Sequence, residues 1–119
     1  MYLVGTLDEL TEDDRRIVTA AGKEIVVFRH RDDVYALSNT CLHQGGPVGE
    51  GPLLGKVEAV LGDDGSYLAD RFSDDRTHLV CPWHGWEYDI RTGRCAALPR
   101  LRLERYETEV RGGEVYVRI

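Results

Sequence analysis

The sequence predicts an all-β domain, and three observations support this prediction. Short runs rich in β-branched residues are separated by turn-forming residues, the C-terminal segment alternates apolar and polar residues, and almost no segment has convincing helical periodicity. The chain has 119 residues, 42% of them hydrophobic, which suits one domain with a modest core. We therefore expect a single domain, 1–119, built from stacked antiparallel sheets.

Residues 2–39 are expected to form a β-meander whose turns lie at 21–23 and 31–33. The acidic stretch 8–14 is interpreted as a solvated loop, with a helical turn begun by Thr11 as the alternative. His30 ends a strand beside charged residues, so we expect a surface histidine and not a ligand. The predicted strands are Arg16–Thr19, Glu24–Phe28 and Val34–Leu37.

The last third of the chain is expected to complete the sheets. Residues 86–90 alternate as a strand, 91–94 turn it back, and Cys95 then falls on the returning segment as a packed thiol. Residues 101–110 and 114–119 alternate with a period of two around Gly112 and Gly113, which predicts a closing hairpin.

Two short motifs carry the chemistry of the chain. Cys41 and His43 form a C-x-H motif, and Cys81 and His84 form a C-x-x-H motif. Each motif offers one soft sulfur ligand and one borderline nitrogen ligand, and the glycines that follow allow backbone to approach inorganic atoms closely. We interpret the four residues as one metal site.

The ligand count fits two kinds of centre. Two cysteines and two histidines can close tetrahedrally on structural zinc, or can hold a [2Fe–2S] cluster with cysteines on one iron and histidines on the other. Zinc fingers have two cysteines in one knuckle and two histidines on one helix. Here each motif contains one cysteine and one histidine. The mixed order favours the cluster.

The motifs resemble the two cluster-binding loops of the Rieske iron–sulfur proteins, in their ferredoxin and oxygenase branch. The similarity covers Cys41–Pro47, the hexapeptide Cys81–Trp86 with the Tyr-Asp pair after it, and the proline-containing segment Ala97–Pro99. It implies a cluster-binding subdomain, about 39–98, at one end of the sheets. It also implies a [2Fe–2S] cofactor, and it places its ligands as follows: Cys41 and Cys81 on the buried iron, His43 and His84 on the outer iron.

The main departure from the family pattern is the length between the motifs. The 37 residues between His43 and Cys81 include an insertion, about 52–79, that should have its own order. Runs 56–61 and 66–69 flank a turn-forming tetrapeptide, which predicts a β-hairpin. The insertion carries a net charge of −3, so it is either a partner-docking element or a solvated decoration. His78 within it is expected to be a surface residue or to lie behind the ligands.

The resemblance also bears on the reduction potential. An oxidised cluster with two thiolates and two neutral imidazoles has no net charge, so it accepts an electron more easily than a four-thiolate cluster, within about −150 to +300 mV. High-potential members carry bridging cysteines at the positions of Gly46 and Trp83, and a serine at Trp86. These groups are absent from this sequence, so we expect a reduction potential in the lower part of that range. Tyr88 matches the family's hydrogen-bonding tyrosine, although a packing role fits equally well.

These features predict an electron-transfer ferredoxin, a component of an oxidoreductase system that carries one electron from a reductase to a terminal oxygenase. It is not expected to be an enzyme itself, because the chain is too short for a catalytic iron domain and shows no flavin or nicotinamide motif. Two alternatives remain: the small subunit of an assimilatory nitrite reductase, or a structural or regulatory metal module.

Charge and composition limit the kinds of partner and the cellular location that we expect for the protein. The net charge of −6 argues against a nucleic-acid surface and favours protein partners with basic patches, although mild acidity for solubility alone is as common. No run is long enough to cross a bilayer, and the N-terminus lacks a signal core, so we expect no membrane association and a cytoplasmic location. Three cysteines, two of them ligands, fit a reducing compartment.

Overall fold

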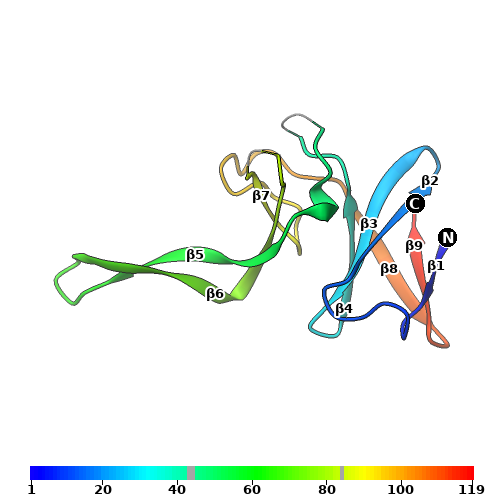
Figure 1. Cartoon of the computed structure of the whole chain (residues 1–119), viewed down its shortest axis with the longest axis horizontal. Helices are drawn as coiled ribbons and strands as arrows, with labels where there is room; N and C mark the ends of the chain where they lie inside the picture. Colours follow the sequence, from blue (N-terminus) through cyan, green and yellow to red (C-terminus); the bar gives the residue numbers. More distant parts are fainter. Residues whose placement is uncertain (43–44, 84) are drawn as a thin grey trace.

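The computed structural model describes residues 1–42, 45–83 and 85–119 and confirms the all-β prediction. Two antiparallel sheets make up the described chain (Figure 1). The larger sheet has the strand order β1-β9-β8-β4-β3-β2. Its strands are β1 (Tyr2–Thr6), β2 (Arg15–Ala20), β3 (Lys23–His30), β4 (Asp33–Ser38), β8 (Arg105–Arg111) and β9 (Glu114–Arg118).

The smaller sheet has the order β5-β6-β7 and contains the predicted hairpin. Its strands are β5 (Leu53–Leu61), β6 (Tyr67–Val80) and β7 (Glu87–Asp89). The hairpin is confirmed, but β6 continues for 14 residues, from the hairpin tip to the second ligand motif. Figure 1 shows the β5–β6 arm projecting away from the rest of the molecule, which is 52 Å long on its longest axis.

Strand β3 of the larger sheet contributes side chains to two hydrophobic cores, one on each of its faces. Its residues 25–28 are all fully buried, because Val26 and Phe28 face the core shared with the small sheet while Ile25 and Val27 face a second core. A strand covered on both faces reads as a continuous apolar run, which is why this segment lacks alternation. The first core also contains Cys41 and Cys81, so the candidate ligands are part of the packing.

The predicted meander and closing hairpin are confirmed with two corrections. The last long strand begins at Arg105 and not at Leu101, because residues 101–104 cross between the sheets: the Leu101 and Leu103 amides donate to the carbonyls of Leu98 and Gly93. Leu103 is fully buried there, and the pairing of this segment is limited to an isolated bridge between Arg102 and Arg94, so the alternation reflected core packing and not a continuous strand. The second correction is β1, which was not expected as a separate strand and pairs antiparallel with β9.

A single turn of 3-10 helix, η1 (Val48–Glu50), supports the chain after the first motif. The buried Asn39 side chain accepts a hydrogen bond from the Gly49 amide at 2.7 Å and donates to the Glu24 carboxylate. Arg15 donates to the carbonyls of Gly49 and Gly51. The first motif is therefore fixed to strands β2 and β3.

Within the described ranges, no helix has the length and apolar character needed to cross a membrane. The boundaries of the cluster-binding subdomain and of the insertion stay predictions.

Candidate metal centre

The first ligand loop is closed by two backbone hydrogen bonds. The Cys41 amide donates to the Gly46 carbonyl at 2.8 Å, and the Gly45 amide donates to the Cys41 carbonyl at 2.9 Å. Gly45 has a φ of +73°, a conformation that side chains other than glycine adopt at a cost. The loop therefore needs glycine four residues after its cysteine.

The second ligand loop repeats this pattern. The Cys81 amide donates to the Trp86 carbonyl at 2.8 Å, and the Gly85 amide donates to the Cys81 carbonyl at 3.0 Å. Gly85 has a φ of +72°. Both loops thus place a cysteine at the start and a left-handed glycine four residues later, a spacing that the sequence carries in both motifs. Two loops of the same form therefore carry the two cysteines.

The two cysteine side chains meet inside the first core. Cys41 and Cys81 are 4% and 1% exposed, and both are free thiols. Burial raises the pKa of the Cys81 thiol, and the hydrogen-bonded Cys41 side chain raises it further, while a backbone hydrogen bond from Trp83 lowers it. Apposed buried sulfurs are the donors that iron in a cluster requires, and bound iron deprotonates a thiol.

Close packing leaves no room for a side chain beside these sulfurs. A Cβ atom added at Gly46 would lie 3.0 Å from the Cys81 Sγ atom and 2.8 Å from the Trp83 ring. The first loop therefore contacts the second loop through bare backbone. Gly46 and Trp83 occupy the positions at which high-potential family members carry bridging cysteines. Here the two residues pack against each other and no sulfur bridge joins them.

Tyr88, on β7 after the second loop, reaches the first loop with its side chain. Its hydroxyl lies 3.2 Å from the Cys41 Sγ atom and accepts a hydrogen bond from the Leu42 amide at 3.2 Å. The ring is fully buried, and burial raises the pKa of its phenol. Of the two roles considered for Tyr88, the hydrogen bond to a ligand sulfur is therefore present together with packing. Cys95, on the segment paired with Tyr88, is fully buried, as the packed-thiol prediction requires.

His43 and His84 lie outside the described residues. The ligand roles of these histidines, and those of Cys41 and Cys81, stay predictions. Their described neighbours Leu42 and Trp83 are 46% and 51% exposed, although both are large and apolar. The described residues that fit a [2Fe–2S] cluster are the two buried sulfurs, the glycine-lined backbone and the hydroxyl that contacts one sulfur.

The structure excludes the surface position for His78, one of the two positions expected, and corrects the surface position expected for His30. His78 is not on the surface: it is 4% exposed, and its Nδ1 atom lies 3.1 Å from the Glu87 carboxylate on the neighbouring strand. His30 is not a free surface residue either, because its side chain is only 14% exposed and contacts Asp13 and Thr77. The contacts of His30 join segments that are distant along the chain, and His78 and Glu87 lie on neighbouring strands. Local sequence patterns do not reveal either arrangement.

Comparisons with known proteins agree with this geometry. The family model of the Rieske [2Fe-2S] domain matches residues 1–107. The chain is 31% identical over 104 residues to the ferredoxin CarAc of Metapseudomonas resinovorans, covering 87% of this chain and 78% of that protein. It spans only 46% of a human Rieske domain-containing protein, to which it is 29% identical over 90 residues, 76% of this chain.

Solved structures give the same result. One chain in the complex of reduced oxygenase and oxidized ferredoxin in carbazole 1,9a-dioxygenase superposes with a TM-score of 0.70 and 27% identity, covering 98% of this chain and 99% of that one. The putative NADH-dependent nitrite reductase small subunit from Mycobacterium tuberculosis has a TM-score of 0.75 at 20% identity, covering 98% of this chain and 93% of that one, which shows a shared fold.

The family match spans both motifs, and the structure brings their cysteines together under the tyrosine that the family pattern expects. The predicted [2Fe–2S] cofactor is thereby confirmed. On the combined strength of motif, fold and comparison, this chain belongs to the Rieske [2Fe-2S] domain family.

Proposed function

We propose that this chain is a ferredoxin that takes one electron from a reductase and delivers it to a terminal oxygenase. The observation that carries the proposal is the juxtaposition of the two buried ligand cysteines under Tyr88. A bound [2Fe–2S] cluster supplies reversible one-electron chemistry. The relatives named above, a CarAc ferredoxin and a ferredoxin bound to its oxygenase, belong to systems of this kind.

The residues of the chain contribute in three ways. Cys41 and Cys81 hold the cofactor within the core, and His43 and His84 are proposed as the outer ligands. The Tyr88 hydroxyl lies 3.2 Å from the Cys41 sulfur. Toward a cluster-bound thiolate, which can only accept, the hydroxyl donates and stabilises added negative charge on that side of the cofactor. The cofactor is thereby anchored on its inner side by two buried loop cysteines and by Tyr88 of β7.

The outer side is suited to brief contact with partners. Leu42 and Trp83 stand next to the proposed histidine ligands in the sequence and expose about half of their surface. Exposed aromatic and aliphatic side chains of this kind are typical of the centre of a protein interface. We propose that they form the contact through which an electron enters and leaves, and that basic residues on the partners complement the net charge of −6.

The proposal treats the chain as an electron carrier and not as an enzyme. It also places the protein in the cytoplasm, where reduced thiols persist and reductases have access to nicotinamide cofactors. The likeness to a nitrite reductase small subunit supports the fold but adds no argument for that role.

The test has two stages. Iron, zinc and sulfide analysis and low-temperature electron paramagnetic resonance should show a reducible two-iron centre, and a redox titration should fit one electron. The chain is then mixed with candidate reductase and oxygenase pairs from the same genome. The proposal expects oxygenase turnover to depend on the chain in one pair. Stable co-purification with a sirohaem subunit, with no oxygenase pair supported, would overturn it.

A further inference from the structure

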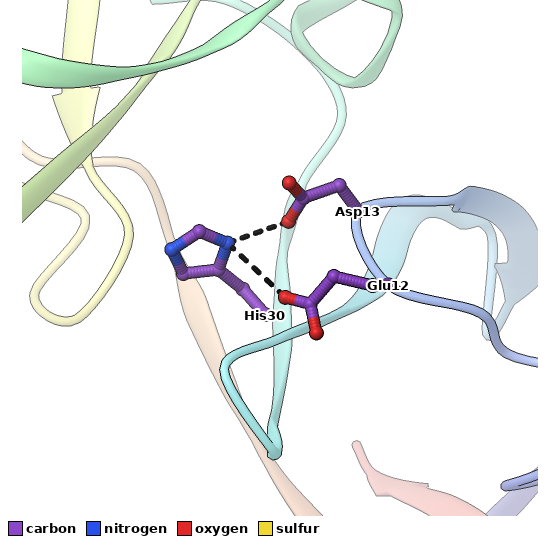
Figure 2. Close-up of side chains that lie close together, drawn as sticks. All are labelled: Glu12, Asp13 and His30. Carbon is purple, nitrogen blue, oxygen red and sulfur yellow. Dashed lines mark hydrogen bonds and ion pairs between the residues drawn. The ribbon is translucent and has the colours of Figure 1, made fainter.

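A second group of metal-ligand side chains lies apart from the two ligand loops. Glu12 and Asp13 belong to the loop before β2, and His30 ends β3. Their ligand atoms all lie within 4.8 Å of one another, and Figure 2 shows both carboxylates directed at the same imidazole nitrogen. The Asp13 Oδ1 atom is 2.5 Å from His30 Nδ1, and the Glu12 Oε1 atom is 3.6 Å from it.

We propose that Glu12, Asp13 and His30 form a site for a divalent zinc-like cation that ties the N-terminal loop to the end of β3. One imidazole and two carboxylates form a mixed nitrogen and oxygen set that suits Zn²⁺ with water completing its shell. Hard Mg²⁺ and Ca²⁺ prefer oxygen ligands alone, so the imidazole selects against them. This inference does not depend on the identity of any redox partner.

The charge of the group favours a cation. Two carboxylates converge on a single nitrogen that can carry at most one proton, so the group remains negative even with a protonated imidazole. Some exposed carboxylates elsewhere in the described chain pair with arginine or lysine, as Glu9 does with Arg16 and Glu104 does with Lys23. The ion pairs found for Glu12 and Asp13 in the described chain are instead with the histidine.

The opposite side of the imidazole is also held in place. The His30 Nε2 atom lies 3.2 Å from the hydroxyl of Thr77 on β6. Histidines that bind metals through one nitrogen characteristically donate the other N–H to such an oxygen, which fixes the tautomer and the ring orientation. The 2.5 Å contact between Asp13 and His30 Nδ1 is a hydrogen bond that needs a proton on one of the two atoms. A cation that binds Nδ1 therefore takes the place of that proton, while an N–H at Nε2 is directed at the Thr77 hydroxyl.

The ligands are already held close to their required positions. The Arg31 amide donates to the Glu12 carboxylate at 2.6 Å, and the Asp13 amide donates to the Arg29 carbonyl at 2.7 Å. Ligand atoms around tetrahedral zinc are separated by about 3.4 Å, given metal–ligand distances of about 2.1 Å. The Asp13–His30 contact must therefore open by roughly 1 Å, which a side-chain rotation of an exposed aspartate can supply.

The experiment uses the cluster-loaded protein, so that the ligand loops are occupied and added zinc must bind elsewhere. Equilibrium dialysis against micromolar ⁶⁵Zn²⁺, with iron and sulfide analysis afterwards, should give one zinc per chain without loss of iron. Thermal unfolding should shift upward when zinc is added, because the ion binds the folded state. Zinc that displaces iron, or fails to bind an intact protein, would overturn the proposal.

Matched variants decide whether the three residues hold the ion. Asp13→Asn and Glu12→Gln keep shape and remove charge, and asparagine tolerates the Asp13 φ of +59°, so both variants should fold. Each should weaken zinc binding at least tenfold, whereas Glu104→Gln, at an exposed carboxylate elsewhere, should not change it. Equal zinc binding in the wild type and in the double variant would show an adventitious ion only, and would refute the site.

Discussion

The hydrogen bond between Tyr88 and Cys41 gives the sharpest prediction about the reduction potential. The Tyr88→Phe variant removes one hydroxyl, which lies 3.2 Å from the Cys41 Sγ atom, and leaves the buried ring in place. A hydrogen bond to a ligand sulfur is stronger when the cofactor carries the extra electron, so its loss destabilises the reduced state. The potential of the variant should fall.

The size of the change follows from ordinary hydrogen-bond energies. If the bond favours the reduced state by about 0.5–1 kcal/mol, the potential falls by about 20–40 mV, since 59 mV corresponds to about 1.4 kcal/mol for one electron. The variant also leaves the Leu42 amide without its hydroxyl acceptor. Because Leu42 is half exposed, the loss of this hydrogen bond should cost about 0.5–1.5 kcal/mol of folding stability.

Protein-film voltammetry measures the potential, and urea unfolding followed by circular dichroism measures the stability. The matched control is Tyr106→Phe, because Tyr106 is also a buried tyrosine but packs in the second core with Ile25 and Val117. Its potential should remain that of the wild type. An unchanged potential in a fully loaded Tyr88→Phe protein, or an equal shift in both variants, would refute the proposed influence of Tyr88 on the cofactor.

Three further predictions concern the ligands, the loop contact and alkaline pH. The His84→Cys variant should retain iron at a lower potential, because a thiolate adds negative charge, whereas Cys81→Ser should lose the cluster; absorption spectra and voltammetry measure both. Gly46→Ala should lower the iron content per chain, because its Cβ atom would lie 2.8 Å from the Trp83 ring. Burial raises the pKa of Tyr106 to about 12, so the stability that its protonated form contributes is complete below its ordinary pKa of 10 and is lost as pH rises through 12.

Each of these has a result that would contradict it. An unchanged spectrum and potential in His84→Cys would mean that the ligand assignment is wrong. Normal iron content in Gly46→Ala, compared with Gly62→Ala at the hairpin tip, would show that the loops can separate without harm. In Tyr106→Phe, the fall in unfolding free energy between pH 10 and 12, at most about 2 kcal/mol, should disappear; the same pH profile as the wild type would exclude the phenol as its source.

The sequence predicted those features that depend on neighbouring residues. The strands from 16 to 37 follow from β-branched runs, and their turns follow from residues that accept a positive φ, such as Gly22 at +75°. The hairpin around Gly62–Gly65 follows from the same local chemistry. The two ligand motifs and their [2Fe–2S] cofactor were recognisable because cysteine, histidine and glycine must stand at fixed spacings for one loop to bind metal.

The prediction of the strand at 101–104 was wrong for a physical reason. Alternating residues indicate which side chains are buried but do not show which backbone groups find a strand partner. Leu103 is fully buried as the pattern required, yet its amide bonds to Gly93 in a crossing between the sheets. Burial was therefore predictable at this position, whereas the hydrogen-bond partner was not.

What the sequence determined by itself was the chemistry of each segment, and what only the tertiary structure decided was which segments meet. Cys41, Tyr88 and Cys81 come together because they pack in the core that one face of β3 shares with the small sheet, and no local pattern specifies that contact. The same holds for Asp13 and His30, which join a loop to a strand end. Such contacts depend on how the sheets pack, since residues far apart in the chain become neighbours only when a common core is buried.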